Sequence, residues 1–344
     1  MSSSVTQARR RVLCLGHPAY VGQEFLKDFG SKYDVEILQS ANREEVQRDL
    51  PVKIASTGPF DAMVIRMGTH PYEPFDEDLL GALVPGCQVI VSASAGYNEF
   101  DVDWMTQNNL YFCNTRNAVS EPTADMAMFL ILAVLKDSTN AEKSTRTGNW
   151  RAKFVPTRDP SGLNLGIIGL GAIGKHLARK ANAFNMKIHY YNRTRLSPDV
   201  EKQFGATYCE NLEELLSLSD VVSVNCPLNA HTTGLISSAE FAAMKDGAYF
   251  VNTARGPIVD EVALIEALES GKICRAGLDV FDAEPSINEY FQKSDHCIVQ
   301  PHLGGLTDAA FRRAEVECFE NIRSFFETGR PVASVNEVSV EIKL

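Results

Sequence analysis

The chain of 344 residues is long enough for two domains, each with its own hydrophobic core. A formal net charge of −11 at pH 7 argues against binding to nucleic acid or to an anionic membrane, and the apolar run 126–135 is too short to cross a bilayer. The 8 cysteines form no C-x-x-C pair and no cluster with histidine, so we expect reduced thiols, a cytoplasmic protein and no metal site. The last three residues, Ile342-Lys343-Leu344, resemble a peroxisomal S-K-L signal only distantly, and we treat the match as chance.

The first part of the chain, up to residue 116, contains strand-like runs that alternate with helical or loop segments. This alternation predicts an α/β unit. No glycine-rich dinucleotide turn follows any of these strands. The predicted strands are Arg11–Leu15, Val35–Leu38, Ala62–Met67, Gln88–Ser92 and Leu110–Asn114.

A strongly apolar helix is predicted next, over Pro122–Lys136, with Pro122 near its first turn, where proline fits a helix. A polar stretch, 146–162, separates this helix from the following strand. We therefore expect a second unit to follow.

The most informative motif is Gly169-Leu170-Gly171-Ala172-Ile173-Gly174. An apolar strand, Leu163–Ile168, precedes it, and apolar residues recur at helical spacing from Ile173 to Phe184. In this context the glycines permit a tight turn, close approach of a pyrophosphate and close packing of helix on strand. The motif therefore predicts a dinucleotide-binding turn.

The end of the next strand, Lys187–Tyr191, indicates which dinucleotide is bound. A site for NAD places Asp or Glu there to bind the ribose hydroxyls, but this chain has Asn192-Arg193-Thr194-Arg195. Guanidinium groups without a carboxylate favour a 2′-phosphate. We expect NADP (NADPH) to be preferred, with NAD still possible.

Six strand-like runs from residue 163 onward have βαβ spacing and predict a doubly wound parallel sheet: 163–168, 187–191, 220–225, 248–252, 275–280 and 296–300. A final helix, Asp308–Thr328, comes too late to belong inside this sheet and is expected to return to the first unit. The fold class is thus α/β with two Rossmann-like domains. A nucleotide-binding domain, 118–307, is inserted into a flavodoxin-like substrate (catalytic) domain formed by 1–117 and 308–344.

Three residues that follow neighbouring strands form a candidate catalytic site, because open parallel sheets bind ligands at the carboxyl ends of their strands. Arg255 can clamp a carboxylate and stabilise a developing alkoxide. His302 can donate a proton, since histidine titrates nearest neutral pH, and Glu284 can orient its ring. This combination suits reduction of a 2-keto acid. The only rival proton donor is His70, which follows a strand of the first unit.

Over nearly its whole length the chain resembles the D-isomer-specific 2-hydroxyacid dehydrogenases. The resemblance implies hydride transfer with a nicotinamide cofactor, and a homodimer formed through residues 120–155. It rests on Ala93–Asn98, Pro122–Asp125, Arg146–Trp150, Gly169–Gly174, Asn252–Asp260, Gly277–Pro285 and Pro301–Gly305.

The resemblance also assigns roles to individual residues. Arg255, Glu284 and His302 match the family's catalytic residues, and Ala95 and Gly96 match a loop whose backbone holds the substrate carboxylate, with Arg255 and His302 completing the substrate site. The full set of predicted cofactor contacts is Gly169, Leu170, Gly171, Ala172, Ile173, Gly174, Asn192, Arg193, Thr194, Cys226, Thr253, Ala254, Asp279, His302 and Gly304.

Two residues depart from the family pattern, namely Asn192, which bears on the cofactor, and Asn98, where Asp is common. The pattern is most similar to glyoxylate/hydroxypyruvate reductases and D-mandelate dehydrogenase. We expect an NADPH-preferring reductase of small 2-keto acids that gives D-2-hydroxy acids. The alternatives are a dehydrogenase for aromatic 2-keto acids and a non-catalytic, dinucleotide-sensing corepressor.

Overall fold

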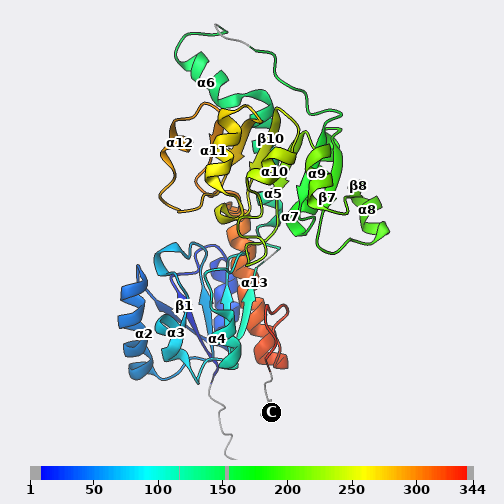
Figure 1. Ribbon diagram of the computed structural model, residues 1–344. Coiled ribbons are helices and arrows are strands. Elements are labelled where there is room, and N and C mark those ends of the chain that lie inside the picture. Colours follow the sequence, from blue (N-terminus) through cyan, green and yellow to red (C-terminus); the bar gives the residue numbers. More distant parts are fainter. Residues whose placement is uncertain (1–8, 116, 152–154, 339–344) are drawn as a thin grey trace, which may run out of the picture. The chain divides into compact units, whose positions relative to one another are not determined.

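The computed structural model describes residues 9–115, 117–151 and 155–338, so the tripeptide Ile342-Lys343-Leu344 lies outside the described residues. It divides into two compact units (Figure 1). The first comprises Met1–Val119 and Leu306–Leu344, and the second comprises Ser120–Gly305.

The first unit contains a 5-stranded parallel sheet in the order β2-β1-β3-β4-β5. The central strands β1 and β3, together with β4 and β5, are almost entirely buried, so they read as continuous apolar runs in the sequence, whereas the edge strand β2 is only partly buried. In this order β2 lies on one side of β1, and the later strands β3, β4 and β5 are added on the other side. This is the flavodoxin-like arrangement. The strands are β1 (Arg11–Leu15), β2 (Asp34–Leu38), β3 (Ala62–Ile65), β4 (Val89–Ser92) and β5 (Tyr111–Asn114).

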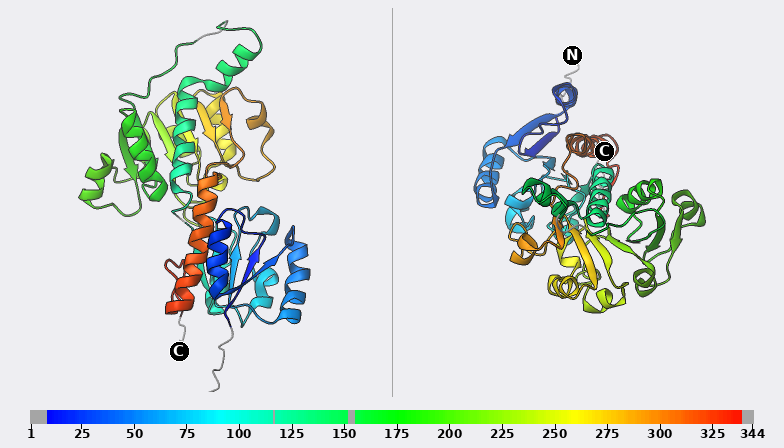
Figure 2. Two further views of the ribbon diagram at one scale, coloured as in Figure 1. Left: turned by 180° about the vertical axis from the view of Figure 1, so that it is seen from behind. Right: turned by 90° about the horizontal axis from the view of Figure 1, so that it is seen from above.

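Helices cover both faces of this sheet. On one face α1 (Gln23–Lys32) packs beside α13 (Asp308–Thr328), where the rings of Phe29 and Phe319 lie 4.8 Å apart (Figure 2). The C-terminal helix therefore returns to the first unit. The opposite face carries α2 (Arg43–Thr57), α3 (Glu77–Leu80) and α4 (Val102–Gln107), and two short 3-10 helices, η1 (His70–Tyr72) and η2 (Gly81–Leu83), complete the unit.

The second unit contains a 7-stranded parallel sheet in the order β12-β11-β10-β9-β6-β7-β8, which confirms the predicted doubly wound fold. The observed strands of this sheet agree with the predicted ones to within one residue at each end, with two exceptions. The edge strand β8 was missed, and β11 spans Ile273–Leu278 rather than 275–280. The strands are β6 (Asn164–Ile168), β7 (Lys187–Tyr191), β8 (Ala206–Tyr208), β9 (Val221–Val224), β10 (Ala248–Asn252), β11 (Ile273–Leu278) and β12 (Cys297–Val299).

Two layers of helices enclose this sheet. A Cβ atom on Gly277 would lie 3.0 Å from the Cβ of Leu130, so the absence of a side chain lets α5 lie close against β11. One layer consists of α5 (Ser120–Lys136), α7 (Ala172–Ala183) and α8 (Pro198–Phe204). The other consists of α9 (Leu212–Leu218), α10 (Ser238–Ala243), α11 (Glu261–Glu269) and α12 (Glu289–Lys293), and the remaining elements are α6 (Ser138–Arg146) and the 3-10 helix η3 (Gly256–Ile258).

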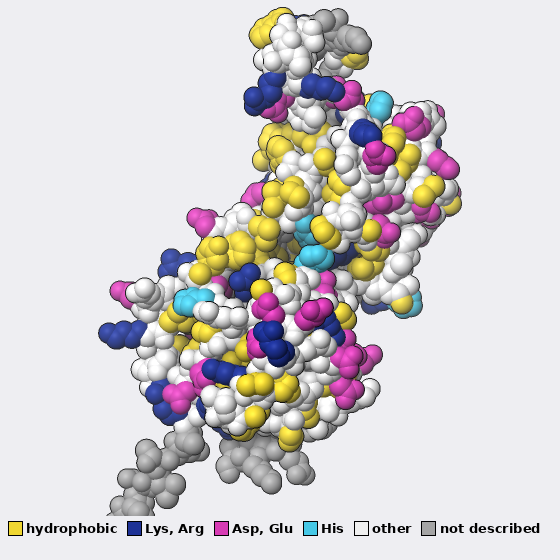
Figure 3. Space-filling view, turned by 90° about the vertical axis from the view of Figure 1, so that its left-hand side faces the viewer, with side chains coloured by type: hydrophobic (Ala, Val, Ile, Leu, Met, Phe, Trp, Pro, Cys, Tyr) yellow, Lys and Arg dark blue, Asp and Glu magenta, His cyan; other side chains and the backbone are white. Residues whose placement is uncertain are grey.

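The distribution of charged and apolar residues indicates which kinds of partner the protein can bind. On the face drawn in Figure 3, Lys and Arg side chains lie among Asp and Glu side chains rather than in one broad basic patch. Within the described part of the chain, no helix has the length and apolar character needed to cross a membrane.

Candidate active site

Two positions of the glycine turn between β6 and α7, Gly169 and Gly174, fit only glycine. Gly169 has a φ of 100°, and a Cβ atom there would lie 2.8 Å from the backbone N of Cys226. At Gly174 a Cβ atom would lie 2.4 Å from the carbonyl O of Gly169. Helix α7 begins at Ala172, directly after this turn, so its first N–H groups are available to an anion.

The residue after β7, Asn192, supports the glycine turn. Its Oδ1 accepts a hydrogen bond of 2.7 Å from the backbone N–H of Leu170. The side chain therefore fixes the turn while bringing no negative charge to the place where an NAD site has a carboxylate. Its position is compatible with a phosphorylated ribose.

The two arginines that follow differ in their contacts. The guanidinium of Arg195 makes hydrogen bonds of 2.8 and 2.9 Å to the carboxylate of Glu201 and lies over the ring of Tyr208. Arg193 is exposed, and the described residues offer it no hydrogen bond or ion pair. Of the two, Arg193 is therefore the one whose charge is available to a ligand.

Two buried polar atoms lie at the carboxyl ends of strands in the same sheet as the glycine turn. They are Thr253 Oγ1, after β10, and Asn225 Oδ1, after β9, and neither has a hydrogen-bond partner within the described part of the chain. Buried polar atoms are normally paired. Together with the free helix N-terminus, these atoms fit a polar ligand such as a dinucleotide.

Cys226, another predicted cofactor contact, follows Asn225 directly. Burial raises the pKa of its thiol to about 11, so the side chain stays protonated and neutral near pH 7. Cys226 therefore offers a cofactor its backbone and a small, uncharged side chain.

The predicted acid, His302, lies after β12 and is bonded to Glu284. The His302 Nδ1 is 2.8 Å from Glu284 Oε2, and the backbone N–H of Phe281 donates to Glu284 Oε1 over 2.8 Å. The backbone of His302 has a φ of 55° and its N–H donates to the carbonyl of Asp279. The ring is thus held through Nδ1, which leaves Nε2 as the nitrogen that can serve a substrate.

The charge of Glu284 is set by opposing effects. Burial alone would raise its pKa, but the hydrogen bond and charge of His302, the N–H of Phe281 and the charge of Arg255 together hold the pKa below its ordinary value. The carboxylate is therefore ionised throughout the neutral range and lies 2.8 Å from the His302 Nδ1.

Asp279 fixes the loop that carries His302. Its two carboxylate oxygens accept backbone N–H groups of Leu303 and Gly304, each over 2.8 Å, and its side chain is buried. Burial raises the pKa of Asp279 in spite of these two hydrogen bonds. A Cβ atom on Gly304 would lie 2.8 Å from Asp279 Oδ2, so glycine is needed for this tether.

The loop after β10 carries Arg255 and is held by Asn252, a residue that the sequence did not single out. The Asn252 amide donates to the carbonyl of Arg255 and accepts from the N–H of Ala254, each over 3.0 Å. A Cβ atom on Gly256 would lie only 1.9 Å from the carbonyl C of Phe281. This close approach joins the Arg255 loop to the loop of Glu284, so the predicted catalytic residues follow adjacent strands of one sheet.

The predicted substrate loop, Ala95-Gly96, belongs to the first unit and follows β4. The side chain of Asn114 donates to the carbonyl of Ala95 over 2.6 Å, which fixes the loop. The rival donor, His70, starts η1 in the same unit and is exposed, and among the described residues no carboxylate bonds to its ring. Of these two histidines, His302 is the one with the carboxylate partner expected of a proton donor.

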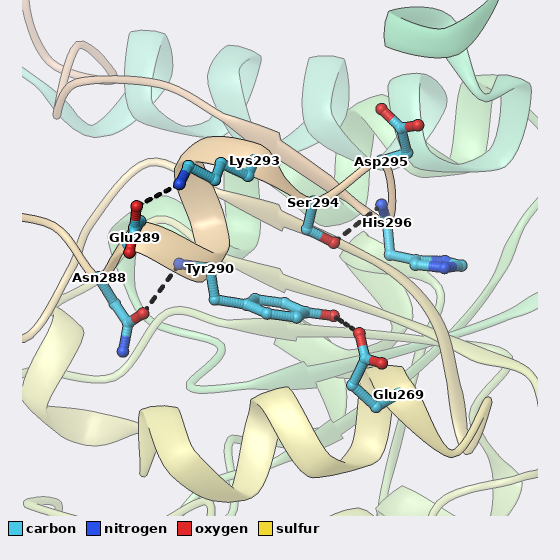
Figure 4. Close-up of a pocket in the computed structure, with 8 residues that line it drawn as sticks. All are labelled: Glu269, Asn288, Glu289, Tyr290, Lys293, Ser294, Asp295 and His296. Atoms are coloured by element: carbon cyan, nitrogen blue, oxygen red, sulfur yellow. Dashed lines mark hydrogen bonds and ion pairs between the residues drawn. The ribbon is translucent and has the colours of Figure 1, made fainter.

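A shallow hollow of about 550 Å³ on the second unit lies at α12 and the end of α11 (Figure 4). Several of its polar groups are bonded to one another, for example Tyr290 Oη to Glu269 over 2.6 Å and the backbone N–H of His296 to Ser294 Oγ. It includes none of the predicted catalytic or cofactor-binding residues, so we assign it no role in the reaction.

The doubly wound sheet, the glycine turn and the bonded histidine and glutamate define a nicotinamide dinucleotide-dependent oxidoreductase. Residues 128–304 match the model of the D-isomer specific 2-hydroxyacid dehydrogenase NAD binding domain. The chain belongs to the family of D-isomer specific 2-hydroxyacid dehydrogenases, which confirms the resemblance seen in the sequence.

Three relatives illustrate the range of this family. A dehydrogenase of Hormonema carpetanum, efuE, is 60% identical over 339 residues, covering 98% of this chain and 85% of its own. The structure of a glyoxylate reductase from Paecilomyes thermophila has 34% identity and a TM-score of 0.88, covering 96% of this chain and 99% of its own. The structure of the holo form of Rhodotorula graminis D-mandelate dehydrogenase has 34% identity and a TM-score of 0.90. The match covers 97% of this chain and 99% of the chain of that dehydrogenase.

Proposed function

We propose that this 2-hydroxyacid dehydrogenase is an NADPH-preferring reductase of small 2-keto acids, of the glyoxylate or hydroxypyruvate type, that forms D-2-hydroxy acids. In this proposal the unit Ser120–Gly305 binds the cofactor and the other unit binds the substrate. The observation that carries it is the hydrogen bond between His302 and Glu284, with Arg255 on the adjacent strand end.

The proposed chemistry divides among these side chains. The reduced nicotinamide, when bound, supplies a hydride to the carbonyl carbon. Arg255, with the backbone of Ala95 and Gly96, binds the substrate carboxylate, and its guanidinium stabilises negative charge on the carbonyl oxygen. His302 Nε2 delivers the proton to that oxygen, and Glu284 holds the ring from its other side.

The glycine turn, Asn192, Arg193 and Thr194 would hold the dinucleotide, and Thr253 Oγ1 offers a buried partner at the next strand end. NADPH preference is supported by the neutral Asn192 and by the unpaired charge of Arg193 beside it.

Replacing Arg193 by Ala is expected to raise the KM for NADPH about ten- to a hundredfold, because a charge-assisted contact to the 2′-phosphate is lost. The KM for NADH, which lacks this phosphate, changes little. Steady-state kinetics with both cofactors measure the difference. Arg195→Ala is the matched control and has a smaller effect, since Glu201 already binds that guanidinium. Equal losses with both cofactors would show that Arg193 does not bind the 2′-phosphate.

Replacing Glu284 by Gln is expected to move the pH profile of keto-acid reduction. The rate falls as pH rises because the imidazolium of His302 is lost. The ionised Glu284, whose pKa is lowered, favours that imidazolium, so the neutral Gln shifts the fall to lower pH. The measurement is kcat/KM for glyoxylate against pH, and an unmoved inflection contradicts the role of Glu284.

A second candidate, reduction of aromatic 2-keto acids, is favoured by the similarity to D-mandelate dehydrogenase. A third, a non-catalytic dinucleotide sensor, predicts cofactor binding without turnover. A panel of glyoxylate, hydroxypyruvate and phenylglyoxylate, each with NADPH and NADH, distinguishes the three. Preferred reduction of phenylglyoxylate indicates the aromatic class, and no turnover of any acid at micromolar enzyme indicates the sensor.

We also propose that two copies of the chain form a homodimer through residues 120–155, which include α5 and α6. Phe129 on α5, Trp150 and Val155 are exposed to 50%, 67% and 71%. Large apolar side chains exposed along one segment are typical of a protein interface. The molecular mass in solution, compared with that of Trp150→Ser, tests this contact.

A further inference from the structure

The loop between β7 and α8, residues 192–197, carries two arginines that differ in their surroundings. Arg193 is exposed and has no hydrogen bond or ion pair to any described residue. Arg195 binds both carboxylate oxygens of Glu201 on α8, from Nε over 2.8 Å and from Nη2 over 2.9 Å. This bidentate pair neutralises one of the two positive charges that follow β7.

Glu201 is held in place for this pairing. Its side chain is only 12% exposed, and its Oε1 also accepts a hydrogen bond of 2.8 Å from the hydroxyl of the buried Tyr190. The same hydroxyl accepts the backbone N–H of Leu196 over 3.0 Å. The hydrogen bonds from Arg195 and Tyr190 lower the pKa of Glu201, so the carboxylate is ionised at neutral pH. Exposed ion pairs are usually weak because both side chains are mobile, but this carboxylate is fixed.

Arg195 is restrained on a second side by Tyr208 of β8. The guanidinium carbon lies 5.2 Å from the centre of the tyrosine ring, which is a cation–π contact. Although 59% of the Arg195 side chain is exposed, a turn towards a ligand would break this contact and both hydrogen bonds to Glu201. The fold therefore keeps this guanidinium against α8 and β8.

The place of the loop makes this pairing relevant to the cofactor. Asn192, its first residue, accepts the backbone N–H of Leu170 over 2.7 Å, so the loop begins beside the glycine turn. Arg193 and Arg195 are two positions apart, and two residues span at most about 7 Å. This distance is comparable to the length of an arginine side chain. A phosphate bound by Arg193 is therefore within reach of an Arg195 that Glu201 does not hold.

We propose that Glu201 is a specificity-determining residue that limits the preference for NADPH. By binding Arg195, it leaves Arg193 as the arginine of this loop that is available to the 2′-phosphate. The loop thus presents one available cation rather than two, so NADPH is favoured without NADH being excluded. This inference rests on the proposed 2′-phosphate site at Arg193 and specifies how strongly that site discriminates.

The test replaces Glu201 by Gln, which keeps an oxygen that can accept the Tyr190 hydroxyl but removes the negative charge that holds Arg195. The KM for NADPH is expected to fall about three- to tenfold, since a charge contact to the phosphate is gained at an exposed position. The KM for NADH, which lacks this phosphate, changes little. Steady-state kinetics with both cofactors give the ratio of the two KM values.

Arg195→Gln and the double variant Glu201→Gln/Arg195→Gln complete a double-mutant cycle. Arg195→Gln alone gives no gain with NADPH, because the guanidinium that would supply it is absent. The double variant is expected to lose the gain seen in Glu201→Gln. A gain that persists without Arg195 would come from the removed negative charge alone and would overturn the proposal.

Asp246→Asn is the matched control for the change in net charge. Asp246 belongs to the same unit and pairs with Lys272 over 2.8 Å. It precedes β10 and so lies at the amino end of that parallel strand, whereas the glycine turn lies at the carboxyl end of β6. This variant is expected to leave both KM values unchanged. Thermal unfolding midpoints show whether any variant is misfolded.

A binding measurement that needs no turnover accompanies the kinetics. Adenosine 2′,5′-bisphosphate carries the 2′-phosphate, and adenosine 5′-monophosphate lacks it. In isothermal titrations, Glu201→Gln is expected to bind the bisphosphate about three- to tenfold more tightly than the wild type does. The affinity for the monophosphate stays the same, because it has no group for Arg195 to bind.

The outcomes of these titrations separate two failures. If the wild type prefers the bisphosphate and Glu201→Gln leaves both affinities unchanged, the role of Glu201 is overturned while the 2′-phosphate site stands. If the wild type and Arg193→Ala each bind the two nucleotides equally well, the 2′-phosphate site itself fails, and with it the preference that Glu201 would limit. Neither result depends on which keto acid the enzyme reduces.

Discussion

The variant His302→Asn is expected to bind NADPH and yet to lose about 10²- to 10⁴-fold in kcat for keto-acid reduction, the range that general acid catalysis contributes. Asparagine cannot donate the proton, while the glycine turn and Arg255 remain unchanged. The loss therefore appears in kcat rather than in cofactor affinity. Quenching of protein fluorescence by NADPH measures binding, and the fall of NADPH absorbance measures turnover.

His70→Ala provides the comparison for this variant. His70 is exposed in the first unit, near the loop that follows β3, so its loss alters the KM for keto acids more than kcat. If His70→Ala abolished turnover and His302→Asn retained most of it, the proton donor would belong to the first unit. Loss of NADPH binding in His302→Asn would instead indicate a structural role for this ring.

Much of the fold could be predicted because parallel strands buried on both faces are continuous apolar runs. All four residues of β3, Ala62–Ile65, and all five of β10, Ala248–Asn252, are buried. The missed strand, Ala206–Tyr208, is at the edge of the sheet and has only three residues, one of them exposed. At an edge the apolar signal is weak, and pairing with β7 rather than composition defines the strand.

The parts of the candidate site that are marked by neighbouring residues in the sequence could be predicted. The glycine turn and the residues directly after β10, β11 and β12 follow from strand positions alone. The contacts that hold them depend on residues far apart in the sequence. Asn192 bonds to Leu170 across 22 positions, and Leu303 bonds to Asp279 across 24. Neither pairing has a signature in the sequence.

The pairing of charged side chains likewise cannot be predicted from the sequence alone. Asn192-Arg193-Thr194-Arg195 presents two equivalent cations in the sequence, but folding brings Glu201 of α8 against only one of them. Which cation is free for a ligand is therefore a property of the fold.

Replacing Arg255 by Gln is expected to lower kcat/KM for 2-keto acids about 10²- to 10³-fold, the usual loss when a donor to a developing oxyanion is removed. The guanidinium has two proposed tasks, and Gln can perform neither as a cation. Arg255→Lys keeps the charge but lacks the planar fork that matches a carboxylate, so it recovers only part of the loss. Steady-state kinetics with glyoxylate and NADPH measure both variants.

The control for these variants is Arg179→Gln, which removes an exposed guanidinium of the same unit that lies on α7 over the ring of Phe204. It is expected to leave kcat/KM unchanged, since Arg179 is not at a strand end. Thermal unfolding separates a local effect from misfolding, since the loop of Arg255 is held by the side chain of Asn252 as well as by the bond of the guanidinium to the carbonyl of Ala254. If Arg255→Gln kept wild-type kcat/KM with an unchanged unfolding midpoint, the carboxylate clamp would have to come from another residue, and the site built on β10, β11 and β12 would lose its substrate anchor.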